Sequence, residues 1–172
     1  MKVISLFVVM FSVSKKLLRG YWTPIMSNQT CPQIQWTCEH VIPKSRIDEH
    51  DDPINWILYP SCLNHARSNY PYINNNTMNG TIKMIYPCSQ KNCSCISMTG
   101  QLVSKKFFIP PNYWKGMISR SVLTMVQKYP HHRSLINQKV LDLTIASLWN
   151  QTFPMTDEEK DWQSLLNGRL HK

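Results

Sequence analysis

The order of apolar and polar residues in the first part of the chain predicts two strands and a short helix. Residues 34–41 have the composition of a strand and lead into a polar loop over 43–52. Residues 56–59 have the composition of a returning strand, and Ser61 is a suitable N-cap for a helix that carries 63–69. This stretch therefore predicts the order strand, loop, strand, helix.

The second half of the chain has the apolar spacing of amphipathic helices. The spacing predicts a helix over 112–129, which Asn112 can cap, and a further helix over 140–149. The sequence Thr156-x-x-Glu159 is a capping box that opens a last helix. We assign these apolar stripes to core packing and give them no cofactor role.

The remaining pattern fits one domain. Residues 81–86 alternate as a half-buried strand after a turn-rich loop over 74–80. No internal repeat or low-complexity linker interrupts the chain, and 172 residues are enough to bury a core of one domain. The strands and helices together predict an α+β fold.

The N-terminus has the features of an export signal. Lys2 precedes an apolar run over 3–13, and small serines near the end of the run offer a cleavage site. The run is shorter than the roughly 20 residues that a membrane-spanning helix needs, so no membrane anchor is expected. We predict a signal peptide over 1–14 and a secreted domain over 15–172, with a buried first strand as the alternative for the apolar run.

The cysteines and the asparagines of glycosylation sequons fit an exported glycoprotein. An even number of cysteines predicts up to three disulfides. Zinc is the alternative, because three of them cluster over 88–95, although no matching second half of a zinc site is present. The cysteines are Cys31, Cys38, Cys62, Cys88, Cys93 and Cys95, and the sequon asparagines are Asn28, Asn75, Asn79, Asn92 and Asn150.

The charge of the chain favours an anionic partner. Lys and Arg number 19 against 10 Asp and Glu, which gives a formal net charge of +9 and a pI of about 9.4. Nucleic acid and an anionic membrane surface are both partners of this kind. Charge alone is unspecific, so it gains meaning only beside a candidate site.

Four residues in the predicted strand, loop, strand, helix segment suit metal-assisted hydrolysis of a phosphodiester. Glu39 and the amide of Asn64 offer hard oxygen ligands to Mg²⁺ or Ca²⁺. His40 has an unperturbed pKa of about 6.5 and can take a proton from an attacking water. Arg67 can donate two hydrogen bonds to phosphate oxygens, with a surface salt bridge as its alternative.

Three sequence blocks surround these residues in a fixed order, and together they resemble the endonuclease I family of secreted and periplasmic nucleases. That family belongs to the ββα-metal, HNH-like nucleases. The resemblance covers about residues 31–130. The blocks are C-E-H-V-I-P-K-S over 38–45, L-Y-P over 58–60 with N-x-x-R-S-N-Y-P over 64–71, and F-I-P-P over 108–111 with K-G-x-x-x-R over 115–120.

The resemblance implies a ββα-metal (His-Me finger) core with additional helices and disulfides. It implies that Glu39 and Asn64 hold one divalent cation, Mg²⁺ or else Ca²⁺ or Mn²⁺, with His40 as general base. Arg67 is then expected to neutralise charge on the phosphoryl oxygens, and Asn69 is either a second candidate amide ligand or a residue that ties down the helix end. The implied activity is cleavage of DNA, and of RNA, with little sequence preference and with 5′-phosphate products, by a protein expected to be monomeric.

Two features of the sequence leave alternatives to this activity. Adjacent residues of a regular strand point to opposite faces, so Glu39 and His40 can share one site only if the strand bends, as the resemblance implies. The family also carries His or Asn just before L-Y-P, where this chain has Trp56 and Ile57. A catalytically silent protein that binds nucleic acid or a host factor is therefore the first alternative, and a disulfide-rich glycoprotein without nucleic-acid binding is the second.

The other histidines have no motif around them, and we expect them to be exposed and without a role. They are His50, His65, His131, His132 and His171. Arg120, in the last block, is expected to be structural and to pair with an acidic residue.

Overall fold

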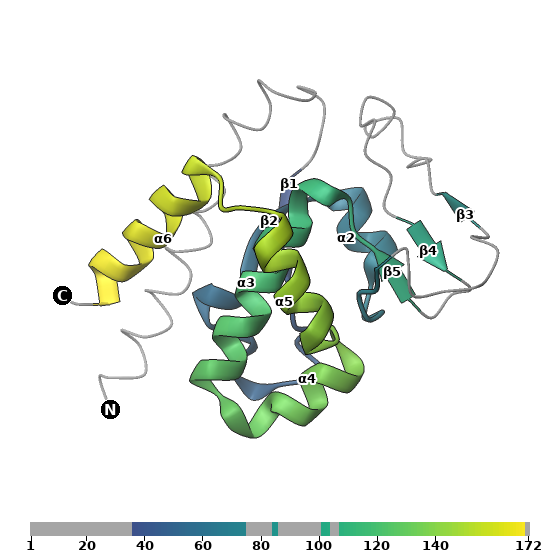
Figure 1. Ribbon diagram of the computed structural model, residues 1–172, viewed down its shortest axis with the longest axis horizontal. Helices are drawn as coiled ribbons and strands as arrows, with labels where there is room; N and C mark the ends of the chain where they lie inside the picture. The colour runs from purple at the N-terminus through teal and green to yellow at the C-terminus, as the bar shows by residue number, and fades with distance from the viewer. Residues whose placement is uncertain (1–35, 75–83, 86–100, 104–106, 171–172) are drawn as a thin grey trace.

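An antiparallel hairpin followed at once by a short helix forms one layer of the fold (Figure 1). This layer shows the predicted order strand, loop, strand, helix. Its elements are β1 (Trp36–His40), β2 (Trp56–Pro60) and α2 (Ser61–Arg67). The computed structural model describes residues 36–74, 84–85, 101–103 and 107–170.

Helix α2 begins and ends two residues earlier than the sequence predicts. The N-cap residue is Pro60, which makes no side-chain cap bond, so the expected capping by Ser61 is wrong. The helix ends because Ser68 adopts a left-handed φ of 50°, and its N–H donates to the carbonyl of Asn64. Because α2 ends here, the residues that follow it turn back toward β1.

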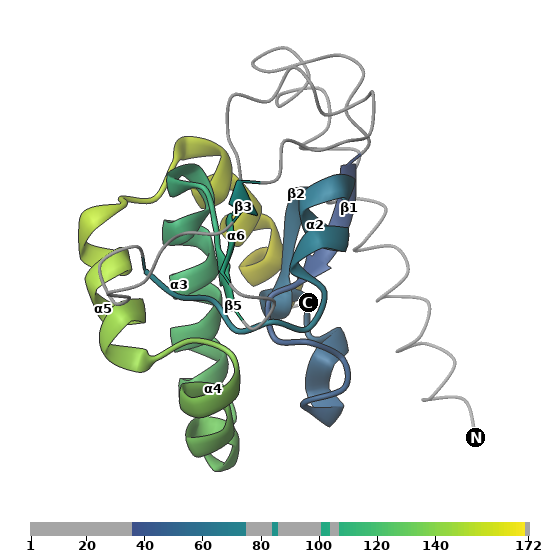
Figure 2. The ribbon, with the colours of Figure 1, turned by 90° about the vertical axis from the view of Figure 1, so that its right-hand side faces the viewer.

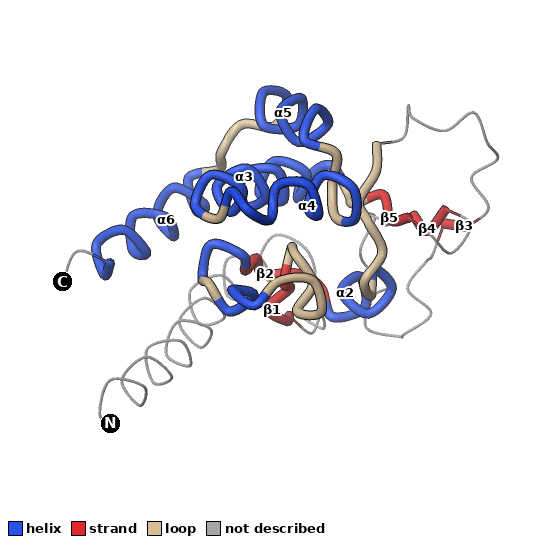
Figure 3. The backbone as a smooth tube through the Cα atoms, turned by 90° about the horizontal axis from the view of Figure 1, so that it is seen from below, coloured by secondary structure: helices blue, strands red, loops and turns tan. Residues whose placement is uncertain are grey.

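Four helices form the second layer, which covers one side of the hairpin (Figures 2 and 3). The helices are α3 (Asn112–Lys128), α4 (Arg133–Lys139), α5 (Leu143–Thr152) and α6 (Asp157–Leu170). Helix α3 runs through the middle and packs against α5 and the hairpin. Its predicted bounds are correct to one residue, but Pro111, not Asn112, is the cap.

The single helix predicted over 140–149 is wrong at its start. The chain is not helical between the end of α4 and Asp142, which is the N-cap of α5. The carboxylate of Asp142 accepts hydrogen bonds from the N–H groups of Thr144 and Ile145. An aspartate in this position satisfies amide groups that have no partner within the helix, so α5 begins after it. Helix α4, which precedes the break, was not predicted.

A small three-stranded sheet lies beyond α2 on one side of the molecule (Figures 1 and 3). Its strands pair antiparallel in chain order, and β3 is the described part of the strand predicted over 81–86. The strands are β3 (Met84–Ile85), β4 (Gln101–Val103) and β5 (Phe107–Ile109). Together the hairpin, this sheet and the helices confirm a mixed α+β fold.

Trp114 joins the two layers in the centre of the core. Its side chain is buried, and its Nε1–H donates to the carbonyl of Leu58 on β2 at 3.0 Å. The ring also packs edge-on against Tyr59, with 5.1 Å between ring centroids, and lies 6.5 Å from the ring of Trp36. Because burial of aromatic surface is a large favourable term, these contacts fix β2 and β1 against α3.

The connection between β1 and β2 is fastened by two polar side chains. It contains the short 3₁₀ helices η1 (Asp48–Asp51) and η2 (Pro53–Asn55). The buried amide of Asn55 accepts from the N–H of Ile42 at 2.7 Å and donates to the carbonyls of Ile42 and His50. Asp52 accepts from Lys128 at 2.6 Å and from Tyr129 at 2.8 Å, at the end of α3. The segment that follows His40 is therefore held in place from both sides.

The K-G-x-x-x-R block is structural. Arg120 forms a bidentate ion pair with Glu159 of α6, with both distances 2.6 Å, as expected for this residue. A Cβ atom on Gly116 would lie 2.5 Å from the carbonyl oxygen of Phe153, so no other residue fits there without movement. Thr156 accepts from the N–H of Glu159 at 3.2 Å, which is one of the two bonds of the predicted capping box, whereas the carboxylate of Glu159 binds Arg120.

Several predictions about export fall outside the described residues. These are the signal segment, four of the cysteines and the sequons at Asn28, Asn75, Asn79 and Asn92. Cys38 lies on β1 and Cys62 on α2, and no disulfide is seen within the described ranges. Asn150 lies exposed on α5. No helix of the described part is long and apolar enough to cross a membrane.

Candidate active site

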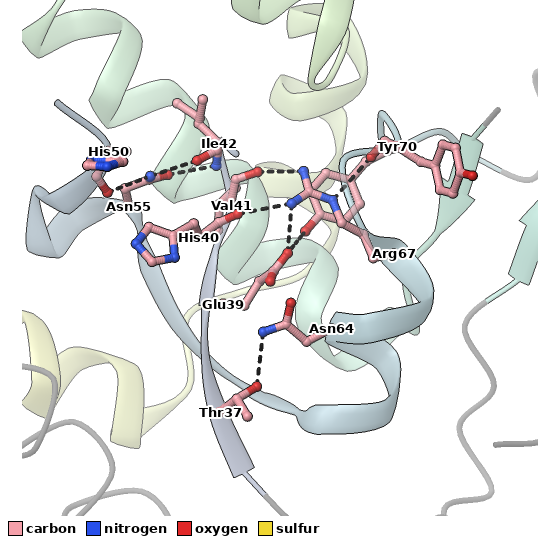
Figure 4. A network of polar contacts seen from close by, with 11 residues as sticks. Thr37, Glu39, His40, Val41, Ile42, His50, Asn55, Asn64, Arg67 and Tyr70 are labelled. Carbon is pink, nitrogen blue, oxygen red and sulfur yellow. Dashed lines mark hydrogen bonds and ion pairs between the residues drawn. The ribbon is translucent and has the colours of Figure 1, made fainter. Parts of the chain in front are cut away.

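Glu39 is buried between β1 and α2, with an exposed fraction of only 3%. Its Oε1 atom accepts a hydrogen bond from Nη1 of Arg67 at 2.8 Å and from the hydroxyl of Tyr72 at 3.1 Å (Figure 4). Both bonds go to the same oxygen, and no side chain of the described segments donates to Oε2. Two donors thus hold one carboxylate oxygen of Glu39 in place.

Arg67 is buried and fastens the end of β1. Its guanidinium donates to Glu39, to the carbonyls of His40 at 3.0 Å and Val41 at 2.7 Å, and to the carbonyl of Tyr70 at 3.1 Å. The exposed surface salt bridge considered for this residue is therefore wrong. A direct contact with phosphate stays a prediction, and it would require the guanidinium to give up some of these bonds.

Asn64 is held so that its oxygen faces the carboxylate. Its Nδ2 donates to the hydroxyl of Thr37 at 3.0 Å, and Figure 4 shows the amide oxygen turned toward Glu39. Thr37 and Glu39 are two residues apart on β1, so they share the face of the strand that looks toward α2. This face brings together an amide oxygen and a carboxylate oxygen, which is a suitable ligand pair for a hard divalent cation.

His40 lies on the other side of β1, facing the connection to β2. Its Nε2 is 3.4 Å from a carboxylate oxygen of Asp51, and its ring lies beside those of Trp56 and His50, with centroids 6.2 and 5.9 Å away. The bend implied between Glu39 and His40 is not seen, because both residues pair regularly with β2. His40 is the last residue of β1, which places its ring at the edge of the hairpin.

Burial changes the proton affinity of the carboxylate in this site. It raises the pKa of Glu39 from its usual value of 4.5 to about 7, although the charge of Arg67 and the hydrogen bonds from Tyr72 and Arg67 act in the opposite direction. Burial also raises the pKa of Tyr72 well above 10, so Tyr72 stays a hydrogen-bond donor at neutral pH. Glu39 is therefore able to gain or lose a proton near neutral pH.

The structure adds residues that the motifs did not single out. Tyr72 and Thr37 hold Glu39 and Asn64, Asp51 faces His40, and Asn55 fixes the chain between them. Tyr72 directly follows the N-Y-P block, which is the only signal for it in the sequence. Asn69, the second candidate amide, lies exposed past the end of α2.

A second cluster of potential metal ligands lies where the β1–β2 connection meets the end of α3. Glu49, His131 and His132 place one ligand atom each within 4.8 Å of one another. The expectation of an exposed, uninvolved histidine is wrong for His132, which is 18% exposed and contacts Glu49 at 2.7 Å. His65 and His131 are exposed as expected, and His50 is partly buried.

A pocket of about 260 Å³ lies between β2, α3 and α6. Its lining is mainly apolar and includes Trp56, Met117 and Trp162. Glu39, His40, Asn64 and Arg67 are absent from this lining, so the pocket is separate from the candidate site.

A comparison with protein families agrees with the motifs. The family model described as Endonuclease I matches residues 10–164, a span that contains all of the candidate site. No curated protein matches the chain.

Proposed function

Because the chain belongs to the Endonuclease I family, we propose that it is a metal-dependent endonuclease that hydrolyses phosphodiester bonds in DNA and RNA with little sequence preference. Membership of this family implies nuclease activity on nucleic acid. The observation that best supports the proposal is the pair of oxygens from Glu39 and Asn64 on one face of β1, with His40 as the next residue. We further propose that the products carry 5′-phosphate ends.

Glu39 and Asn64 would hold the divalent cation. The second carboxylate oxygen of Glu39 and the amide oxygen of Asn64 are hard ligands, which suit Mg²⁺ and also Ca²⁺ or Mn²⁺. The residues fit such an ion for two reasons. Arg67 and Tyr72 both donate to Oε1 of Glu39, and no described side chain donates to Oε2. The hydrogen bond from Asn64 to Thr37 fixes the orientation of the amide. When bound, the cation supplies Lewis-acid stabilisation of charge at the phosphate and the leaving oxygen.

Arg67, Tyr72 and Thr37 act as positioning residues in this proposal. Arg67 and Tyr72 both bind one oxygen of Glu39, and Thr37 orients the amide of Asn64. Neighbours that fix a ligand in this way commonly have 10- to 100-fold effects on metal affinity or activity, by order of magnitude. We therefore propose that Arg67 affects metal affinity by positioning Glu39, in addition to the phosphate contact predicted from sequence.

His40 is the general base of the proposed reaction. The carboxylate of Asp51 faces Nε2 of His40, and a carboxylate beside one ring nitrogen orients the imidazole for proton transfer from water. Asp51 would also stabilise the imidazolium that forms. Contacts made mainly to phosphate would position the nucleic acid without reading its bases, which accounts for low sequence preference.

The regular pairing of β1 supports one other function. Glu39 and His40 leave opposite faces of the strand, which favours a catalytically silent protein that binds nucleic acid without cutting it. Binding without cleavage in the presence of Mg²⁺ would identify this alternative. The signal peptide, secretion, disulfides, glycosylation and monomeric state stay predictions from the sequence.

The metal assignment is tested by substituting each ligand. Glu39→Gln and Asn64→Ala should both raise the Mg²⁺ concentration that gives half-maximal cleavage, and Glu39→Gln should have the larger effect because it removes the ligand charge. Asn69→Ala is the matched control, since that exposed amide has only a structural part. If Asn69→Ala changes the Mg²⁺ requirement and Asn64→Ala does not, the wrong amide has been assigned.

The raised pKa of Glu39 predicts how metal affinity depends on pH. A protonated carboxylate is a poor ligand, so the affinity for Mg²⁺ should be constant well above pH 7 and fall below it, approaching about tenfold for each pH unit. Calorimetric titration of Mg²⁺ into His40→Ala protein measures this without titration of the general base. Glu39→Gln should lose the pH dependence, and an unchanged affinity between pH 8 and pH 6 would contradict the assignment.

The excess of basic residues predicts binding that weakens with salt. Each neutralised phosphate of a DNA duplex contributes a slope of about −0.9 to the logarithm of affinity against the logarithm of salt concentration. Fluorescence anisotropy of a labelled duplex with His40→Ala protein measures the slope without cleavage. An affinity that does not change with salt would show that the net charge of +9 has no part in binding.

A further inference from the structure

Two segments that are far apart in the sequence bring two histidines and a glutamate together. Glu49 lies in η1, and His131 and His132 lie in η5 (Pro130–His132), at the corner between α3 and α4. One ligand atom from each side chain lies within 4.8 Å of the others. A single ion could therefore contact all three side chains after small side-chain movements.

Two of the three distances between ligand atoms are close to those of a tetrahedral metal centre. Metal–ligand bonds of about 2.0–2.1 Å place neighbouring ligand atoms of a tetrahedral zinc site about 3.3 Å apart. Nε2 of His131 lies 3.6 Å from one oxygen of Glu49, and Nε2 of His132 lies 2.7 Å from the other. The first distance already fits, and the second must open by less than about 1 Å. The ligand atoms of the two histidines lie within 4.8 Å of each other and would move toward the same spacing.

The ligand types select a different class of metal from that of the candidate active site. Imidazole nitrogen suits Zn²⁺ and its neighbours in the first transition row, whereas Mg²⁺ and Ca²⁺ prefer oxygen ligands. Two histidines and one carboxylate are a known ligand set for zinc, with water in the fourth position. The 30% exposure of Glu49 and the 62% exposure of His131 give an ion and water access from solvent.

Contacts beside the cluster hold the two segments next to each other without a metal. Asp52, three residues after Glu49, binds both Lys128 and Tyr129 at the end of α3. The ring of Tyr129 also lies edge-on to that of His131, with centroids 6.4 Å apart. The ligands are therefore carried by segments that are already fastened to each other.

We propose that Glu49, His131 and His132 form a second metal site, selective for Zn²⁺ or a similar transition-metal ion, that joins the β1–β2 connection to the corner between α3 and α4. The site is independent of the nuclease proposal. Its metal would tether the segment that carries Asp51, whose carboxylate faces His40.

The test is a titration of metal-free full-length protein with Zn²⁺, followed by calorimetry, and with Co²⁺, followed by its visible absorption. We expect one Zn²⁺ per chain at this site and absorption bands typical of tetrahedral Co²⁺. His132→Ala and His131→Ala should each weaken Zn²⁺ binding by at least about 100-fold, since loss of even a residue that supports a ligand costs about 10- to 100-fold. Glu49→Gln should weaken it as well.

Two variants act as controls. His65→Ala removes an exposed histidine of α2, and Glu39→Gln removes the carboxylate proposed for Mg²⁺; both should keep the affinity for Zn²⁺. His131→Ala changes a mostly exposed side chain, so it remains informative if His132→Ala fails to fold. Binding that is unchanged in both histidine variants, binding lost in Glu39→Gln, or a thiolate-to-cobalt absorption band in the near ultraviolet would each overturn the proposal. Absence of Zn²⁺ binding would also overturn it and would show that Glu49 and the two histidines form only ion pairs.

Discussion

Replacing His40 with alanine should lower the rate of DNA cleavage by at least about 100-fold, the usual cost of losing a general base. The affinity for DNA should stay nearly unchanged, because phosphate contacts and net charge remain. Single-turnover cleavage of supercoiled plasmid at saturating Mg²⁺ measures the rate, and circular dichroism checks that the variant is folded.

His50→Ala is the matched control for this variant. The ring of His50 lies 5.9 Å from that of His40, and its Nδ1 lies 3.9 Å from the second carboxylate oxygen of Asp51, but the proposal gives His50 no proton to transfer. It should therefore keep a rate close to that of the wild type. A folded His40→Ala protein with the wild-type rate would remove His40 from the mechanism.

Arg67→Ala should lower the free energy of unfolding by about 3–5 kcal/mol, the range measured when one partner of a buried ion pair is removed. The change leaves the buried carboxylate of Glu39 without its cation and takes a donor from the carbonyls of His40 and Val41. Urea unfolding at pH 8 without metal measures the effect. A loss below about 1 kcal/mol would be typical of a surface pair and would contradict the burial of Arg67.

The effect of Arg67→Ala should depend on pH with a definite sign. The pKa of Glu39 is raised in the folded state, so its contribution to stability is present at low pH and is lost as the pH rises from about 4.5 to about 7. Below this range Glu39 is protonated and leaves no unpaired charge, so the variant should lose less stability at acid pH than at pH 8. The double variant with Glu39→Gln should likewise recover part of the stability at pH 8.

The first layer of the fold was predictable from local patterns. Short apolar segments of strand composition flank a polar loop, and the helix follows at once, so sequence order and composition were enough for β1, β2 and α2. The break before α5 was not found, because an apolar helical spacing continues through 140–149 and hides the capping by Asp142. Apolar spacing predicts one continuous helix, whereas a capping aspartate predicts that a new helix starts there. The spacing alone does not decide between these two predictions.

The composition of the candidate site was easier to predict than its geometry. The motif blocks supply Glu39, His40, Asn64 and Arg67, but motif spacing carries no information on burial. The bonds from Arg67 to the backbone carbonyls of His40 and Val41 cross 27 and 26 positions of the chain. The contact between Glu49 and His132 crosses 83. Contacts of this range depend on packing of the layers, which no local pattern encodes.

The central claim is tested most directly by incubating the full-length, folded protein with supercoiled plasmid in Mg²⁺, in EDTA, and in EDTA followed by excess Mg²⁺. The proposed function predicts nicked and linear DNA with 5′-phosphate ends in Mg²⁺, no cleavage in EDTA, and recovery when Mg²⁺ is restored. Folded protein that binds the plasmid without cutting it in Mg²⁺, Mn²⁺ or Ca²⁺ would contradict the claim. Cleavage that persists in EDTA, or that proceeds at the wild-type rate in the His40→Ala variant, would contradict it equally.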